Sequence, residues 1–227
     1  MSIYLIFIIF ALLSWIVQKV LQSKFKKYSV IALPNGLTGK DVAEKMLREN
    51  GITDVKVEHV EGRLTDHYNP ATKIVNLSED VYFGDSISAA AVAAHECGHA
   101  VQHAKAYAFL NLRSKLVPAV SFASKWMQWI LLAGILLLSY FPQLMLIGII
   151  LFALTTIFSF VTLPVEINAS QRAIAWLSNA GITNVSTYPM ATDALRWAAY
   201  TYVVAALGSL ATLVYYILIF IGGTRRN

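Results

Sequence analysis

The sequence has little of several residue types on which soluble and secreted proteins depend. Its 227 residues include one cysteine, which excludes an internal disulfide framework. Charged residues make up only 14% of the chain, against about 25% in ordinary soluble proteins. The chain also lacks a glycine-rich phosphate loop, a GxSxG elbow, a CxxC pair and any internal repeat. The best-known signatures of phosphate binding and serine hydrolysis are therefore missing.

Apolar residues dominate what is present. They form 57% of the chain and gather in long runs, which is typical of an integral membrane protein. The net charge is +5, and the basic residues stand beside the apolar runs rather than in a separate tail. This pattern indicates anionic lipid head groups as partners and argues against nucleic acid.

The apolar runs predict about four transmembrane helices. The first, Ile3 to Leu21, is a signal anchor rather than a cleaved signal peptide, because no basic segment precedes it and no small-residue cleavage site follows. The block from Trp126 to Leu163 is too long for one span and is interrupted around Pro142. We expect a hairpin there, with spans over 126–140, beginning nearer Val117 if the first is longer, and over 144–163. The last span runs from about 202 to 221.

Charges beside these spans predict their orientation. Four lysines follow the first span, at Lys19, Lys24, Lys26 and Lys27. The positive-inside rule therefore places the N-terminus outside and the following segment in the cytoplasm. The hairpin turn carries no charge, whereas its open ends are flanked by Lys115, Lys125 and Arg172. The last span would leave Arg225 and Arg226 outside, against the rule. Either the first span dominates the orientation or the last segment does not fully cross.

Residues 28–125 form the one long stretch of mixed composition. Thr38 and Asp41 resemble a capping box that opens a helix to about Asn50, and Gly51 is its stop. Short strands are expected over 55–60 and 73–77. A strand beside a metal helix either binds an extended peptide by backbone pairing or only packs the small domain, and the sequence leaves both open.

The motif His95-Glu96-Cys97-Gly98-His99 indicates the chemistry. The run Ser86–Ala94 before it is rich in helix formers, so both histidines lie on one helical face, where they reach one zinc ion. Glu96 is then the general base that acts on water. Cys97 points elsewhere on the helix and is expected to be a small buried residue. The alternative is an ordinary amphipathic helix with two exposed histidines.

A third zinc ligand is expected downstream. His103 continues the four-residue spacing, but it lies about 12 Å along the helix axis from His95, too far for one tetrahedral site. In the metzincin pattern the third histidine would occupy the position of Lys105. Glu166 follows the third span in an apolar setting where an unpaired acid is costly. Two histidines and a glutamate form a catalytic zinc set with the fourth position open for water.

Three stretches together resemble the bacterial membrane zinc metallopeptidases of the YugP type: residues 62–70, 93–103 and 163–166. The resemblance covers nearly the whole chain and extends more distantly to HtpX-type and CAAX-prenyl membrane proteases. It implies a bacterial protein. In those distant relatives an aspartate four residues after the glutamate orients a zinc-bound histidine. Here Ser170 holds that position, with Asn168 nearby, so this support is expected to be weaker or to come from elsewhere.

The predicted fold class is therefore a membrane α-helical protein with a small α+β, zincin-like catalytic domain. The expected parts are an N-terminal anchor over 1–23, a cytoplasmic α+β part with the HExxH helix over 24–125, and a transmembrane hairpin over 126–163. A helix carrying the third ligand and a connector follow over 164–198, and a C-terminal span and tail over 199–227.

The predicted function is a multi-pass, gluzincin-like zinc endopeptidase of the cell membrane, the bacterial inner membrane by resemblance. His95, His99 and Glu166 hold Zn²⁺, and Glu96 is catalytic. Because Glu166 lies close to a span end, the site should be near the cytoplasmic surface. Substrates are then membrane-associated proteins or peptides, presented along the strand around 73–77, and membrane protein quality control is a candidate process. The sequence does not rank the candidate oxyanion donors, which are His67, Arg196, Tyr200 and Tyr202.

Two other classes compete with this prediction. A site-2-type intramembrane protease would carry the motif on a span, but this helix is too polar for lipid and no LDG-like second motif follows. A non-enzymatic membrane scaffold with structural zinc would require four protein ligands rather than three.

Overall fold

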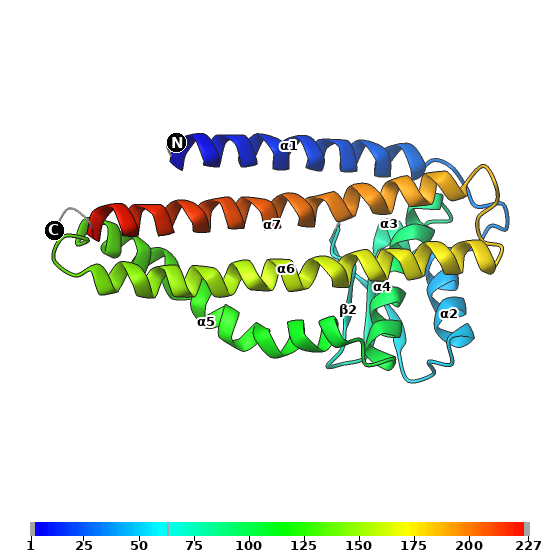
Figure 1. The fold of residues 1–227 in the computed structure, drawn as a ribbon. Helices are drawn as coiled ribbons and strands as arrows, with labels where there is room; N and C mark the ends of the chain where they lie inside the picture. Colours follow the sequence, from blue (N-terminus) through cyan, green and yellow to red (C-terminus); the bar gives the residue numbers. More distant parts are fainter. Residues whose placement is uncertain (1–2, 63, 225–227) are drawn as a thin grey trace. The chain divides into compact units, whose positions relative to one another are not determined.

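A computed structural model describes residues 3–62 and 64–224, and it divides into two compact units. The helical unit comprises Met1–Trp15, Asn111–Leu163 and Tyr202–Asn227. The α+β unit comprises Ile16–Leu110 and Pro164–Thr201. Figure 1 labels the helices of both units and strand β2. Arg63 of the family-like stretch and the arginines of the C-terminal tail lie outside the described residues.

Four helices among the described residues are long and apolar enough to cross a membrane. They are α1 (Ile3–Tyr28), α5 (Ala108–Leu136), α6 (Pro142–Asn179) and α7 (Tyr188–Thr224). This number agrees with the predicted one. Large apolar side chains on α1 are exposed, with Phe7 at 74% and Trp15 at 61%. Apolar surface of this extent is expected where a helix faces lipid.

The predicted hairpin is present between α5 and α6. Pro142 is the first residue of α6, where its missing N–H costs no helical hydrogen bond. The two helices pack closely, because a Cβ atom on Gly134 would lie 2.6 Å from the Cα atom of Met145. The first arm is longer than the predicted 126–140, since α5 begins at Ala108.

The second arm of the hairpin continues far beyond the predicted end of its span. Pro164 stands inside α6, and the helix runs on to Asn179. Glu166 therefore lies well inside the helix, so the expectation that the helix ends close to it is wrong. The extension carries an apolar stripe at four-residue spacing that is fully buried, namely Val165, Ala169, Ala173 and Leu177. Such a stripe anchors the extension in the α+β unit.

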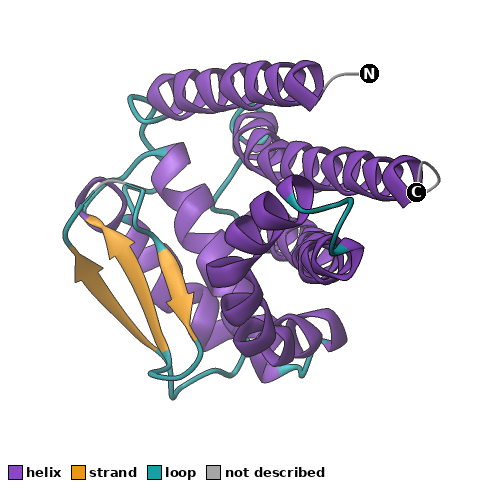
Figure 2. Ribbon diagram, turned by 90° about the vertical axis from the view of Figure 1, so that its left-hand side faces the viewer, coloured by secondary structure: helices purple, strands orange, loops and turns teal. Residues whose placement is uncertain are grey.

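The α+β unit begins with α2 (Gly39–Glu49), which has the predicted capping box between Thr38 and Asp41. Gly51 follows with a φ of +72°, a conformation that favours glycine after a helix end. Three strands form one sheet, β1 (Lys56–Val60), β2 (His67–Asn69) and β3 (Ile74–Ser78), in the order β1-β3-β2. Figure 2 shows these strands as one layer. β2 was not predicted, and neither was the short α3 (Glu79–Tyr82).

The position of β3 corrects one expectation about substrate binding. β3 pairs in parallel with β1 and antiparallel with β2, so its backbone groups are engaged on both sides. The strand around 73–77 is therefore not available to an added peptide. Only β1 and β2 are edge strands of the described sheet.

The helix α4 (Ile87–Ala104) carries the HExxH motif, and its first turn is capped by the Ser86 side chain, which accepts from the Ala89 N–H. Val75 and Leu77 of β3 are fully buried in the same apolar core as the first half of α4. α2 packs against α4 as well. Each large apolar side chain buried in this way contributes about 1.5–3 kcal/mol. The motif therefore stands on a helix fixed by the sheet and by α2.

Candidate metal centre

Two adjacent helices of the α+β unit bring the three predicted ligands together. His95 and His99 lie one turn apart on α4, and their rings are 4.8 Å apart. Their Nε2 atoms lie 3.3 and 3.4 Å from Oε2 of Glu166 on α6. The side chains are 14%, 11% and 4% exposed, so the cluster is shielded from solvent. One ligand atom from each residue lies within 4.8 Å of the other two.

This geometry fits zinc. Ligands placed about 2.0–2.2 Å from a tetrahedral zinc ion stand about 3.3–3.6 Å from each other. The two nitrogen-to-oxygen distances, 3.3 and 3.4 Å, fall in that range. Two neutral imidazoles and one carboxylate are also the donor set of several catalytic zinc sites.

The close approach of α4 and α6 depends on Gly98, which lies between the two histidines. A Cβ atom there would lie 2.7 Å from the Ala169 carbonyl oxygen, which belongs to helix backbone and cannot move aside alone. Only glycine lets the two helices meet at this distance.

Substitution of Gly98 should therefore open the site. We expect Gly98→Val to force α6 away from α4 and to lower zinc occupancy at least tenfold, because the Glu166 ligand moves with α6. Metal analysis of the purified protein measures the effect. Gly51→Val, where nothing lies within 4 Å of the added Cβ, is the control for a glycine substitution as such, although its positive φ costs some stability. Full zinc occupancy in Gly98→Val would contradict the close-packing argument.

The second nitrogen of each histidine ring has its own partner. Nδ1 of His95 lies 3.1 Å from Oγ of Ser170, at the position where the distant relatives have aspartate. Nδ1 of His99 lies 3.0 Å from Oε1 of Gln102. With Nδ1 occupied, the Nε2 atom of each histidine faces the Glu166 carboxylate. Hydrogen-bond partners of metal-ligating histidines orient the rings in this way.

Gln102 connects the two helices of the site, and the sequence did not single it out. It is fully buried, and its Nε2 donates to the Val165 carbonyl oxygen at 2.8 Å and to Oδ1 of Asn168 at 3.0 Å. The Arg172 Nε donates to the same Asn168 oxygen at 2.7 Å. The only signal in the sequence was the spacing of three residues from His99 on one helical face.

The electrostatics of His99 depend on its burial and on two carboxylates. Desolvation by burial favours the neutral ring, but the hydrogen bond to Glu166 and the charges of Glu96 and Glu166 outweigh it and raise the pKa of His99. A proton on this ring competes with a metal ion, so His99 must be neutral before it ligates.

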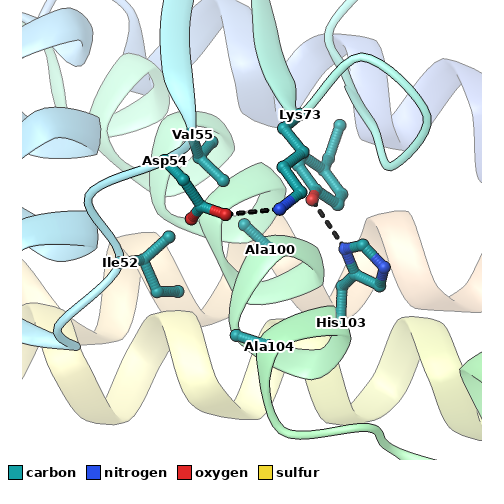
Figure 3. Close-up of a pocket in the computed structure, with 8 residues that line it drawn as sticks. Ile52, Asp54, Val55, Lys73, Ala100, His103 and Ala104 are labelled. Atoms are coloured by element: carbon teal, nitrogen blue, oxygen red, sulfur yellow. Dashed lines mark hydrogen bonds and ion pairs between the residues drawn. The ribbon is translucent and has the colours of Figure 1, made fainter.

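Glu96 is buried and is not one of the three clustered residues. Its Oε2 accepts a hydrogen bond of 3.0 Å from the backbone N–H of Tyr68 on β2. The Tyr68 hydroxyl in turn lies 2.8 Å from Nδ1 of His103. His103 is not one of the three clustered residues, in agreement with the spacing argument, and its ring contacts Tyr68 instead (Figure 3).

The candidate oxyanion donors lie in separate parts of the structure. His67 uses both ring nitrogens, at 2.7 Å from the Thr65 carbonyl oxygen and 3.2 Å from Nδ2 of Asn76. Tyr200 packs edge-on against Trp197 on α7, the helix that also carries Arg196 and Tyr202. The oxyanion role of His67, Arg196, Tyr200 and Tyr202 stays a prediction.

Cys97 is fully buried, and its Sγ lies 3.5 Å from the carbonyl oxygen of Ala43 on α2. The thiol therefore faces α2 rather than the metal cluster. Burial, followed by the charge of Glu96, raises the pKa of its thiol well above the ordinary value. A thiol that stays protonated is a poor metal ligand, so Cys97 is the small buried helix residue that the sequence predicted.

Comparison with known proteins identifies the family. Residues 3–221 match the family described as "Putative neutral zinc metallopeptidase". The chain belongs to this family. It is also similar to the "Putative membrane protease YugP" of Bacillus subtilis (strain 168), with 45% identity over 215 residues, or 95% of each chain. No solved structure matches the chain. The match covers three of the four apolar helices completely, the fourth up to residue 221, and the His-His-Glu cluster. The cofactor of this zinc metallopeptidase family is zinc.

Proposed function

We propose that the protein is an integral-membrane zinc endopeptidase in which His95, His99 and Glu166 hold the metal and Glu96 is the general base. The observation that supports it best is the pair of distances, 3.3 and 3.4 Å, from two imidazole nitrogens to one carboxylate oxygen. Glu96 follows His95 directly on the same helix. We also propose that the α+β unit is zincin-like, which the packing of the motif helix against a small sheet supports.

The residues of the chain divide the chemistry between them. Zinc, when bound, supplies Lewis acidity toward water and the scissile carbonyl group. Glu96 takes the proton from the attacking water and passes it to the nitrogen of the leaving amine. The Tyr68 N–H holds the Glu96 carboxylate in place, at 3.0 Å. Ser170 and Gln102 keep the two imidazoles turned toward the metal position.

The edge strand β2 is the proposed docking site for an extended substrate. β2 is an edge strand that packs against α4. Its Tyr68 N–H is already used by Glu96, so a peptide pairs with other backbone groups of this edge and lies next to that carboxylate. A peptide that pairs along this edge passes close to the general base. This replaces the strand around 73–77 as the substrate-binding element.

Two observations weigh against the competing classes. Structural zinc sites have four protein ligands, whereas the cluster of His, Cys, Asp and Glu side chains in the described residues contains three. A site-2-type protease would have the motif on a membrane span. Among the described residues, the four candidate spans are other helices, and α4 is not one of them.

The proposal extends to location. We infer that 1–23, 126–163 and 199–227 belong to the membrane part, that 24–125 and 164–198 form the cytoplasmic catalytic part, and that the membrane is the bacterial inner membrane. Lysines after the first span support this orientation. The substrates are membrane-associated proteins cut near the cytoplasmic face, with membrane protein quality control as the candidate process.

Metal removal tests the enzyme class. The parent protein in detergent should cleave a fluorogenic peptide library. After dialysis against a zinc chelator it should lose at least about 99% of the cleavage rate, because the general base alone supplies only part of the catalysis. One equivalent of zinc should restore the rate. Cleavage at an unchanged rate in chelated, zinc-free protein would overturn the proposal.

Cysteine labelling tests the orientation. In a Cys97→Ala background, Asp80→Cys should react with a membrane-impermeant maleimide only from the cytoplasmic side. Tyr140→Cys in the hairpin turn, where the native side chain is 79% exposed, should react only from outside. Labelling of position 80 only from outside contradicts the cytoplasmic placement and the substrates inferred from it.

A further inference from the structure

Four polar side chains of the α+β unit form an unbroken line of hydrogen bonds that ends at the His99 ring. Arg172 and Asn168 lie one turn apart on α6, and the Arg172 Nε donates to Oδ1 of Asn168 at 2.7 Å. Nε2 of Gln102 donates to the same Oδ1 at 3.0 Å, and its Oε1 lies 3.0 Å from Nδ1 of His99. The two residues of α6 are half-buried, whereas the two residues of α4 are buried. We call these four residues the His99 relay.

The chemistry of Arg172 fixes the first amide of the relay, because a guanidinium group has N–H donors and no acceptor. The Asn168 atom that faces Arg172 must therefore be the side-chain oxygen. The same oxygen faces the amide of Gln102, so the Gln102 atom next to it must be the NH₂ nitrogen. An amide side chain has two possible orientations, and each amide of the relay satisfies its contacts in only one of them.

The Val165 carbonyl oxygen requires the same orientation of Gln102. A carbonyl oxygen is an acceptor only, and this one lies 2.8 Å from Nε2 of Gln102. Two oxygens of α6 thus receive the two N–H groups of the amide, and its own oxygen faces His99. Because Gln102 is fully buried, an amide that turned over would leave buried donors and acceptors unmatched, which is costly.

The orientation of Gln102 decides where the proton of a neutral His99 ring lies. A neutral imidazole has one N–H group and one lone pair, and either nitrogen can carry the proton. The Gln102 oxygen is an acceptor, so Nδ1 of His99 must carry the proton and donate it. Nε2 then has the lone pair, and this is the atom that lies 3.4 Å from Oε2 of Glu166. A metal ligand requires that lone pair.

The partner of His95 does not act in this way. Nδ1 of His95 faces the Ser170 hydroxyl at 3.1 Å, and a hydroxyl group both donates and accepts. That contact turns the ring but does not assign its proton. The relay is therefore a separate device, and it serves His99.

We propose that Asn168 and Arg172 are positioning residues of the metal site. They hold the Gln102 amide in the one orientation that places a proton on Nδ1 of His99 and presents Nε2 to the metal. The inference rests on the proposed function in taking His99 as a ligand. The proton on Nδ1 is measurable in zinc-free protein, however, so the relay and the ligand assignment fail separately.

Two substitutions at position 168 separate the hydrogen bonds from the shape of the side chain. Leucine has nearly the shape of asparagine but no acceptor, so Asn168→Leu deprives Gln102 and Arg172 of their shared oxygen. Aspartate has an oxygen at that place in either orientation, so Asn168→Asp should preserve the relay. Gln171→Leu is the matched control, because Gln171 is an exposed amide on the same stretch of α6.

Nuclear magnetic resonance detects the ring protons of full-length, zinc-free protein in detergent, isotopically labelled only in its histidine nitrogens. His99→Ala identifies the His99 signals by their loss. We expect a protected Nδ1 proton on His99 in the parent, in Asn168→Asp and in Gln171→Leu. In Asn168→Leu this proton should exchange with water at least about tenfold faster, because the Gln102 amide loses one of the two hydrogen bonds that hold it.

Competition with a chelator measures the zinc affinity of the same proteins, and circular dichroism checks their helix content. Asn168→Leu should bind zinc about tenfold more weakly than the parent, at the lower end of the effect of partners that orient a ligand. Arg172→Met acts one residue farther from His99 and should lower the affinity about threefold. Asn168→Asp and Gln171→Leu should keep the parent affinity.

The relay is wrong if Asn168→Leu keeps both the parent exchange rate and the parent zinc affinity. It is also wrong if Asn168→Asp is as defective as Asn168→Leu, since the role of the side chain would then be packing. Parent values in Arg172→Met would remove Arg172 from the proposal.

The same measurements separate the relay from the proposed function. If the Nδ1 proton is protected in the parent and exposed in Asn168→Leu, but the parent binds no zinc, the relay stands and the ligand assignment fails. If the parent binds zinc and cleaves peptides, and Asn168→Leu does both equally well, the proposed function stands and the relay fails.

Discussion

The Glu96→Gln protein is expected to bind zinc like the parent and to lose peptide cleavage by a factor of about 10²–10⁴, the usual contribution of a general base. In the parent protein the Tyr68 N–H donates to the Glu96 carboxylate at 3.0 Å. Glutamine has nearly the same shape, and its side-chain carbonyl oxygen can accept the same hydrogen bond. An amide cannot take a proton from water at neutral pH. Because Glu96 is not in the metal cluster, zinc occupancy should not change.

The measurement pairs metal analysis with a peptide-cleavage rate for each purified protein. Glu58→Gln is the matched control, since Glu58 is an exposed carboxylate on β1, and we expect parent rates from it. Cleavage by Glu96→Gln at the parent rate would show that another group is the base. Loss of zinc from Glu96→Gln would instead show that this carboxylate takes part in ligation.

The parts of the fold that follow from local signals were predictable. α2 begins at the Thr38–Asp41 capping box and ends before Gly51, as expected, because both helix ends depend on contacts within a few residues. The hairpin at Pro142 was predictable for the same reason. The end of α6 was not predictable, because Pro164 favoured a break in the helix at that residue. The buried stripe that carries the helix on to Asn179 depends on packing in the α+β unit.

Strand β2 was missed because three residues are too few to show an alternating pattern. Its pairing with β3 joins Tyr68 to Val75, and only that pairing places β3 in the centre of the sheet. The expectation that a peptide binds along 73–77 failed for this reason. A strand in the sequence does not reveal whether it lies at an edge.

The candidate ligands were predictable because the chemistry of zinc restricts them. Two histidines four apart and one acid in an apolar setting leave few alternatives in this chain. Gln102 was not predictable, since its partners, Val165 and Asn168, are more than 60 positions away and fix its role only in space. The resemblance alone pointed to position 170, where the distant relatives have aspartate, and Ser170 does contact His95.

Removal of a ligand should have a different signature from removal of the base. Glu166→Gln keeps the shape of the side chain but replaces a carboxylate by a neutral amide, which is a poor zinc ligand. His99→Ala removes an imidazole. We expect both proteins to lose zinc and cleavage together, whereas Glu96→Gln separates the two. The loss of zinc affinity should exceed the factor of about 10–100 that is typical for a partner that only orients a ligand.

Ser170→Ala supplies that smaller effect for comparison, because Ser170 contacts Nδ1 of His95 and is not in the metal cluster. Zinc affinity is measured by competition with a chelator, and circular dichroism checks that each protein keeps its helix content. The expected order of affinity is parent and Glu96→Gln first, then Ser170→Ala, then Glu166→Gln and His99→Ala. If Glu166→Gln bound zinc as tightly as Ser170→Ala, Glu166 would only orient a histidine, and the third ligand would have to come from another residue. A factor of ten or more between them makes Glu166 the ligand that joins α6 to the histidine pair of α4.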